Sequence, residues 1–181
     1  MKRIQILIFV FALAVFISGC TLLCFTPPTP DDAEAFLKNN QHDIDVVVSF
    51  LKSIDTADHA YIDRNDTTVF YEFEYHEITP KDVRTSLRHL WSAGCECISI
   101  QNGDNTVYFE MWRRTMGNVS CGISCTLNGQ GVPKAELQTE CTPISNGWFY
   151  YFADYEEYRK SPSKYDEMWD TGVVENETGA S

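Results

Sequence analysis

The chain has 181 residues, and its 26 acidic and 14 basic side chains give a formal charge of −12 at pH 7. A surface with this charge repels phosphate groups, which argues against nucleic-acid binding and against membrane attachment through a basic patch. The length is that of one domain with a sizeable hydrophobic core.

The first 20 residues have the organisation of a signal peptide. Lys2 and Arg3 provide a positive start, an apolar run follows, and small residues lead to Cys20. The apolar run has about 14 residues, fewer than the roughly 20 that a membrane-spanning helix needs. Its end resembles the lipobox of bacterial lipoproteins, in which the cysteine is lipidated and begins the mature protein. We therefore expect residues 1–19 to be a lipoprotein signal peptide; ordinary cleavage nearby is the alternative.

Lipidation of Cys20 determines where the protein works. We expect it on the extracytoplasmic side of the cell membrane, with the membrane as a partner through the lipidated Cys20. The mature chain then has 12 basic and 26 acidic residues, a formal charge of −14. Residues 20–30 contain three prolines, which favour an extended tether.

Two helices are predicted from caps and apolar spacing. The first runs from Pro30 to about Asp55, with Thr29 as its N-cap and acidic residues in its first turn. The second runs from about Pro80 to Ala93, with Asp82 in the position of a capping-box acid. Gly94 then provides a left-handed end.

The remaining segments predict strands and a tail. In residues 67–76 the alternation places Val69, Tyr71, Phe73 and Tyr75 on one face. The expected strands are residues 60–62, 67–76, 95–100, 106–114, 119–127 and 148–153, with residues 134–144 also extended. Short links between most of them predict an α+β fold, a mainly antiparallel sheet of five to six strands with two helices on one face. Residues 31–155 form the single domain, and residues 156–181 are expected to be an acidic tail, a short helix followed by disorder.

The layout and three glycine-containing segments carry a family resemblance. These are Gly-Asp-Asn-Thr-Val-Tyr-Phe from residue 103, Gly-Ile-Ser-Cys-Thr-Leu-Asn-Gly from residue 122, and Gly-Trp-Phe-Tyr-Tyr from residue 147. Together they resemble small uncharacterised exported proteins of Gram-positive bacteria, over residues 31–155. The resemblance supports the fold and implies no activity.

Six cysteines besides Cys20 raise the question of disulfides, because exported proteins often contain them. Cys121 and Cys125 share the core face of their strand, whereas Cys95 and Cys97 lie opposite the apolar residues of theirs. We expect Cys141 to pair with one of Cys97, Cys121 or Cys125, and inert buried thiols are the alternative. Zinc ligation and cysteine catalysis both lack a recognisable spacing, so no metal, cofactor or catalytic residue is assigned.

Acidic and aromatic residues share the outward face of the predicted strands. They form the candidate binding face: Phe70, Glu72, Glu74, His76, Tyr108, Glu110 and Trp112. Such a combination suits a protein or glycan ligand, and an ordinary solvated sheet face is the alternative.

Three functions remain open from the sequence. The first is a membrane-anchored lipoprotein with a non-catalytic binding or structural domain. The second is an extracytoplasmic hydrolase that uses Glu72, Glu74 or Glu110 with His76. The third is an immunity or inhibitor protein whose acidity suits a basic partner. The absence of a catalytic motif favours the first.

Overall fold

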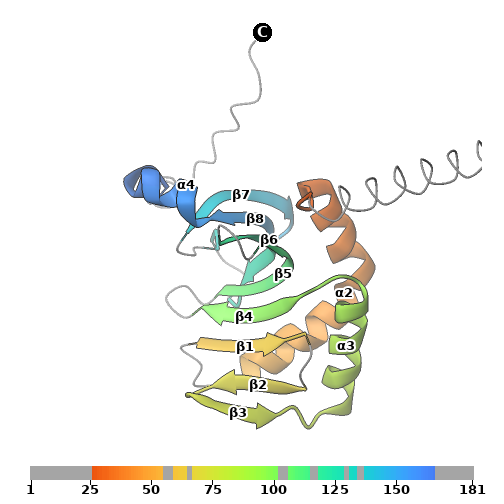
Figure 1. The fold of residues 1–181 in the computed structure, drawn as a ribbon. Coiled ribbons are helices and arrows are strands. Elements are labelled where there is room, and N and C mark those ends of the chain that lie inside the picture. Colours follow the sequence, from red (N-terminus) through yellow and green to blue (C-terminus); the bar gives the residue numbers. More distant parts are fainter. Residues whose placement is uncertain are drawn as a thin grey trace, which may run out of the picture.

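One antiparallel sheet organises the molecule. The computed structural model describes residues 26–54, 59–64, 67–101, 106–114, 118–128, 131–133 and 137–165. Within them, eight strands lie in the order β3-β2-β1-β4-β5-β6-β8-β7 (Figure 1). The strands are β1 (His59–Asp63), β2 (Thr68–Tyr71), β3 (Glu74–Glu77), β4 (Cys97–Gln101), β5 (Thr106–Arg114), β6 (Val119–Thr126), β7 (Gln138–Ser145) and β8 (Trp148–Asp154), and the helices are α2 (Pro30–Ser53), α3 (Lys81–Ser92) and α4 (Tyr155–Lys160).

The predicted α+β class and antiparallel sheet are confirmed, but the element count is wrong. The described residues contain eight strands and three helices. One reason is that residues 67–76 form two paired strands, β2 and β3, rather than one. Glu72 and Phe73 turn the chain between them with φ of 51° and 64°, so Phe73 is 94% exposed rather than buried. Tyr75, expected on the same face as the buried Val69, is exposed as well.

The third helix, α4, is the short helix expected at the start of the acidic tail, and it begins at Tyr155. It packs against β7 and β8 at the end of the sheet. Beyond it, Tyr165 is buried and its hydroxyl donates to Glu157 Oε1 at 3.3 Å. The ordered domain therefore extends at least ten residues past Tyr155.

The predicted helix starts differ in outcome. At α2, Thr29 and Asp32 form a capping box, with the Thr29 N–H donating to Asp32 Oδ2 at 2.8 Å. At α3, Pro80 is the N-cap and no side chain caps the helix, so the expectation for Asp82 is wrong. The helix ends as predicted, since Gly94 has φ of 104° and the Cys95 N–H reaches the Leu90 carbonyl at 3.0 Å.

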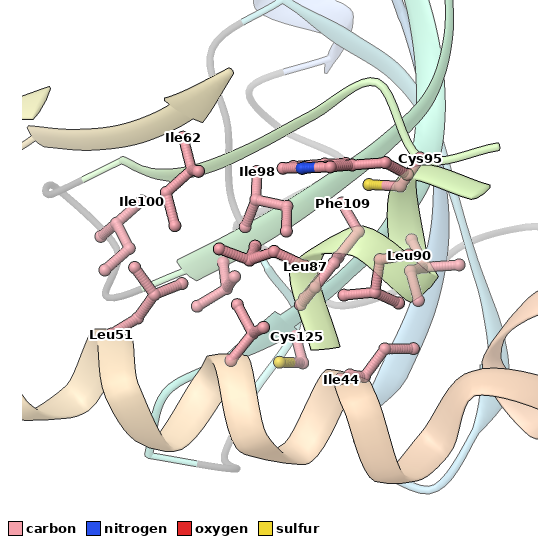
Figure 2. Packing of buried hydrophobic residues seen from close by; sticks show 14 of the residues in the cluster. Ile44, Leu51, Ile62, Leu87, Leu90, Cys95, Ile98, Ile100, Phe109 and Cys125 are labelled. Carbon is pink, nitrogen blue, oxygen red and sulfur yellow. The ribbon is translucent and has the colours of Figure 1, made fainter. Parts of the chain in front are cut away.

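Helices α2 and α3 cover the same face of the sheet and enclose the core. Figure 2 shows Ile44 of α2 and Leu87 of α3 pointing at strand residues such as Ile98 and Phe109. Cys95 belongs to this core, although the sequence placed it on the opposite face. The face of the sheet turned away from α2 and α3 is called the outer face below.

The predicted signal peptide and Cys20 lie outside the described residues, as does most of the tether. Among the described helices, none combines the length and the apolar character that crossing a membrane requires.

Candidate functional site

Two rows of paired residues form a hollow on the outer face. The first row contains Cys97, Glu110, Gly122, Tyr151 and Cys141, which are successive partners across β4, β5, β6, β8 and β7. The second contains Arg113, Ser120, Ala153 and Gln138 on β5, β6, β8 and β7. In the second row the small residues Ser120 and Ala153 lie between Arg113 and Gln138, and of the first row Cys97, Glu110 and Tyr151 line the hollow. The result is a pocket of about 350 Å³, within the usual range for small-molecule sites of about 300–1,000 Å³.

A bidentate ion pair lies on one side of this pocket. Arg113 Nε approaches Glu110 Oε1 at 2.8 Å, and Arg113 Nη2 donates to Glu110 Oε2 at 2.9 Å. A β-bulge between Glu110 and Trp112 allows this, because it returns Arg113 to the outer face. Burial raises the pKa of Glu110 despite the lowering effects of Arg113 and Ser120. The pair therefore forms a preorganised polar wall whose two charges neutralise each other.

Gln138 lies on the opposite side of the pocket with its hydrogen-bonding capacity unused. Its side chain is 1% exposed, and within the described part of the chain neither Oε1 nor Nε2 has a partner. A side-chain amide offers two donors and an acceptor, and leaving such a group buried without partners costs about 1 to 3 kcal/mol. Native structures contain few such groups, and each calls for an explanation. A polar ligand that reached both atoms from the pocket would satisfy them.

A second hollow continues the first along the outer face. The two share Cys97, Ser99, Glu110 and Arg113. The second, of about 670 Å³, extends across β4 to Tyr61 on β1. The two hollows together are called the outer groove below.

An aromatic cluster stands at the β1 end of the outer groove. Phe70 packs between Tyr61 and Tyr75, with ring centroids 5.3 Å and 4.9 Å away. The hydroxyls of Tyr61 and Tyr75 lie 2.9 Å apart, which fixes both rings. Tyr61 lines the groove itself, so the groove has a polar end and an aromatic end.

The structure separates the seven residues of the predicted binding face. Phe70, Tyr108 and Glu110 do lie on the outer face, and Tyr108 and Glu110 line the groove. The other four lie elsewhere: Glu72 in the turn after β2, Glu74 and His76 on the strand face of buried Val69, and Trp112 against the core. The prediction that all seven residues share one face was wrong for these four. The turn and the bulge each change which face of the sheet the following side chains point to.

His76 is therefore separated from Glu110, its expected catalytic partner in the hydrolase alternative. Its ring stacks on Tyr71 at a centroid distance of 3.9 Å. Among the residues that the structure describes, no histidine lines the first hollow, and His59 lines the second. His59 pairs with Gln101 whereas Cys97 pairs with Asp63, four residues along the strands and about 13 Å away. This histidine cannot activate the Cys97 thiol directly.

The five described cysteines are all free thiols, so the predicted bridge to Cys141 is not formed. Strand β8 lies between β6 and β7, which places the Cys121 and Cys141 backbones about 9.6 Å apart, beyond the roughly 7 Å limit for a disulfide. Cys97, on β4, is separated from β7 by the three strands β5, β6 and β8. Cys125, opposite Trp148, faces the core.

Burial makes these thiols poor nucleophiles. It raises the pKa of Cys97 to about 11 and that of Cys141 to about 12. Nucleophilic cysteines have depressed pKa values instead. Within the described residues, no three side chains of His, Cys, Asp or Glu come together as a metal-binding group. The arrangement is thus suited to holding a polar molecule by hydrogen bonds.

Sequence reasoning missed Gln138, the residue that most strongly indicates a ligand. One glutamine in an extended segment is ordinary in a sequence, and its meaning depends on the partners that surround it.

Comparison of the chain with protein-family models, with curated proteins and with solved structures found no match in any of the three.

Proposed function

We propose that this protein is a membrane-anchored extracytoplasmic lipoprotein whose domain binds a polar ligand in the outer groove without catalysing a reaction. The observation that carries the binding role is Gln138, a buried amide with no partner that lines the first hollow. A ligand that occupies the hollow would explain why two buried hydrogen-bonding atoms have no partner within the described part of the protein.

The groove favours binding over hydrolysis. Glycoside hydrolysis uses two carboxyl groups on either side of one bond. The first hollow has one carboxylate, Glu110, and Arg113 contacts both of its oxygens. Asp63 and Glu96 line the second hollow together with Glu110, so the case against hydrolysis rests on the contact between Glu110 and Arg113. A carboxylate engaged by a guanidinium is better placed to orient a ligand than to donate a proton.

The anchor part of the proposal rests on the first 20 residues. A charged start, a short apolar run and Cys20 after small residues together support lipidation. Diacylation at one cysteine supplies two chains, the number that stable membrane attachment requires. The acidic domain would not associate with anionic headgroups by itself.

Intact mass spectrometry of the protein recovered from membranes tests the anchor. We expect a chain that begins at Cys20 and carries acyl mass. A chain cut elsewhere, with no acyl mass, would show that the protein is exported without a lipid.

Nuclear magnetic resonance of the Gln138 side-chain amide tests the binding role. The purified full chain in detergent is titrated with amino acids, dipeptides, nucleosides and saccharides. We expect at least one of these classes to shift the Gln138 Nε2 resonance and to raise the melting temperature of the wild type. Gln138→Leu should remain folded and lose that response, because leucine fills a similar volume without hydrogen bonds. A ligand response that Gln138→Leu retains in full would place binding outside the groove.

A further inference from the structure

The groups that line the outer groove show what kind of ligand it suits. Its charged side chains balance, with three carboxylates and three guanidinium groups: Asp63, Glu96 and Glu110, and Arg64, Arg113 and Arg114. The chain as a whole carries a formal charge of −12. A site that is neutral within such an acidic protein is suited to an uncharged ligand, since a charged one would need an excess of the opposite sign.

The polar groups of the groove are planar and bidentate. Carboxylates accept two parallel hydrogen bonds, guanidinium groups donate two, and the Gln138 amide does one of each. Neighbouring hydroxyl groups on a sugar ring match this geometry, because each hydroxyl both donates and accepts. Arg113 has five N–H groups, and its two contacts with Glu110 use two of them.

The aromatic end of the groove complements the apolar side of a sugar ring. The face of an aromatic ring is negative, so it attracts weakly positive C–H groups. Tyr61 lines the groove, and its neighbours Phe70 and Tyr75 hold it in place. From Gln138 on β7 to Tyr61 on β1 the groove crosses six neighbouring strands, a span of roughly 24 Å at about 4.8 Å per strand. That length suits several linked rings rather than one.

We propose that the outer groove binds a short, neutral oligosaccharide, with hydrogen bonds to Gln138 at one end and a sugar ring stacked on Tyr61 at the other. This inference rests on the proposed binding function and specifies its ligand class. Gln138 would contact the first ring, whereas only a longer saccharide would reach Tyr61.

Isothermal titration of the full chain in detergent with named saccharides tests this. The probes are chitotetraose, cellotetraose and maltotetraose, with N-acetylglucosamine and glucose as the matching single rings. We expect at least one tetrasaccharide to bind more tightly than its single ring. Gln138→Leu should weaken both about tenfold, the effect of losing one or two hydrogen bonds. Tyr61→Leu should weaken only the tetrasaccharide, about threefold to tenfold.

Phe73→Leu is the matched control, because Phe73 is also aromatic and exposed but lies in the turn after β2. It should leave the affinity for every saccharide unchanged. Thermal unfolding of each variant shows whether a loss of binding reflects a loss of folding, and the Gln138 amide resonance of the wild type reports occupancy without any substitution.

The outcomes separate this inference from the binding function on which it rests. If an amino acid, a dipeptide or a nucleoside shifts the Gln138 amide and no saccharide does, the oligosaccharide inference is overturned while the groove remains a binding site. If the tetrasaccharide binds no better than the single ring and Tyr61→Leu has no effect, the extended site is overturned. If none of the tested probes affects Gln138, both proposals are overturned.

Discussion

Gly122 lies directly opposite Glu110 across the β5–β6 pair, and no larger residue fits there. A Cβ atom at Gly122 would lie 3.0 Å from the Glu110 Cα and closer still to the Phe109 carbonyl oxygen. These are backbone atoms, so they cannot turn away as a side chain would. The close approach of the β5 backbone therefore requires a glycine opposite Glu110.

Gly122→Ala should therefore destabilise the protein by about 1 to 3 kcal/mol, the usual cost of forcing an extra group into a packed site. Chemical denaturation measures the change in the free energy of unfolding. Ser124→Ala is the control on the same strand and face. The Ser124 hydroxyl is buried without a partner among the described residues, so its removal should be neutral or stabilising. Equal stability of Gly122→Ala and the wild type would show that β5 can move away from β6.

The Glu110 carboxyl should make stability depend on pH in an unusual direction. Burial raises its pKa above the ordinary value of 4.5. Protonated Glu110 thus stabilises the folded state. This stabilisation is fully present below pH 4.5 and is lost as the pH rises through the raised pKa. Glu110→Gln has no such loss. We expect the stability of the variant relative to the wild type to increase from pH 4 to pH 7 in urea unfolding.

Arg113→Gln provides the partner experiment for Glu110. Without the guanidinium, less positive charge offsets the cost of ionising the buried carboxyl. The pKa of Glu110 should therefore rise further, and the loss of stability should extend to higher pH. If Glu110→Gln instead became relatively less stable as the pH rose, the attraction of Arg113 would outweigh the cost of burial.

The turn between β2 and β3 contains a strain that substitution can relieve. Glu72 and Phe73 both have positive φ, a conformation that disfavours residues with a side chain. Two-residue hairpin turns of this kind prefer Asn-Gly. The double variant Glu72→Asn, Phe73→Gly should raise the free energy of unfolding by about 1 kcal/mol. The reversed order, Glu72→Gly with Phe73→Asn, should give a smaller gain. A loss of stability in the first variant would indicate a different turn.

The thiols should react slowly in the folded protein. Burial raises the pKa of Cys97 to about 11 and those of Cys121 and Cys125 to about 12, so little thiolate exists at neutral pH. We expect iodoacetamide to label the five described cysteines far more slowly than free cysteine. All five should be labelled after denaturation without a reductant, as peptide mass spectrometry would show. A requirement for reductant would mean that a disulfide forms.

The sequence predicted long elements well and local reversals poorly. Helix α2 was expected from Pro30 to about Asp55 and runs from Pro30 to Ser53. Its cap and its repeated apolar spacing are local signals that tertiary packing did not override. The turn at Glu72 and Phe73 was missed because it contains neither glycine nor asparagine.

Only part of the candidate site could be predicted from the sequence. Tyr108 and Glu110 were recognised because they alternate with core residues before the bulge, whereas Trp112 was misplaced because it follows the bulge.

The order of the strands in the sheet could not be predicted from the sequence either. That β8 lies between β6 and β7 is decided by pairing distant in sequence, and it determines both the isolation of Cys141 and the position of Gln138.

The hydrogen bond from the Tyr150 hydroxyl to the Pro28 carbonyl oxygen, at 3.0 Å, joins the start of the domain to β8. Tyr150 is itself buried in the core, opposite Ile123 of β6. A pulling force on the N-terminal segment therefore reaches an inner strand of the sheet as well as the first turn of α2. Separating the start of α2 from the sheet therefore requires breaking this hydrogen bond as well as the apolar contacts of the helix.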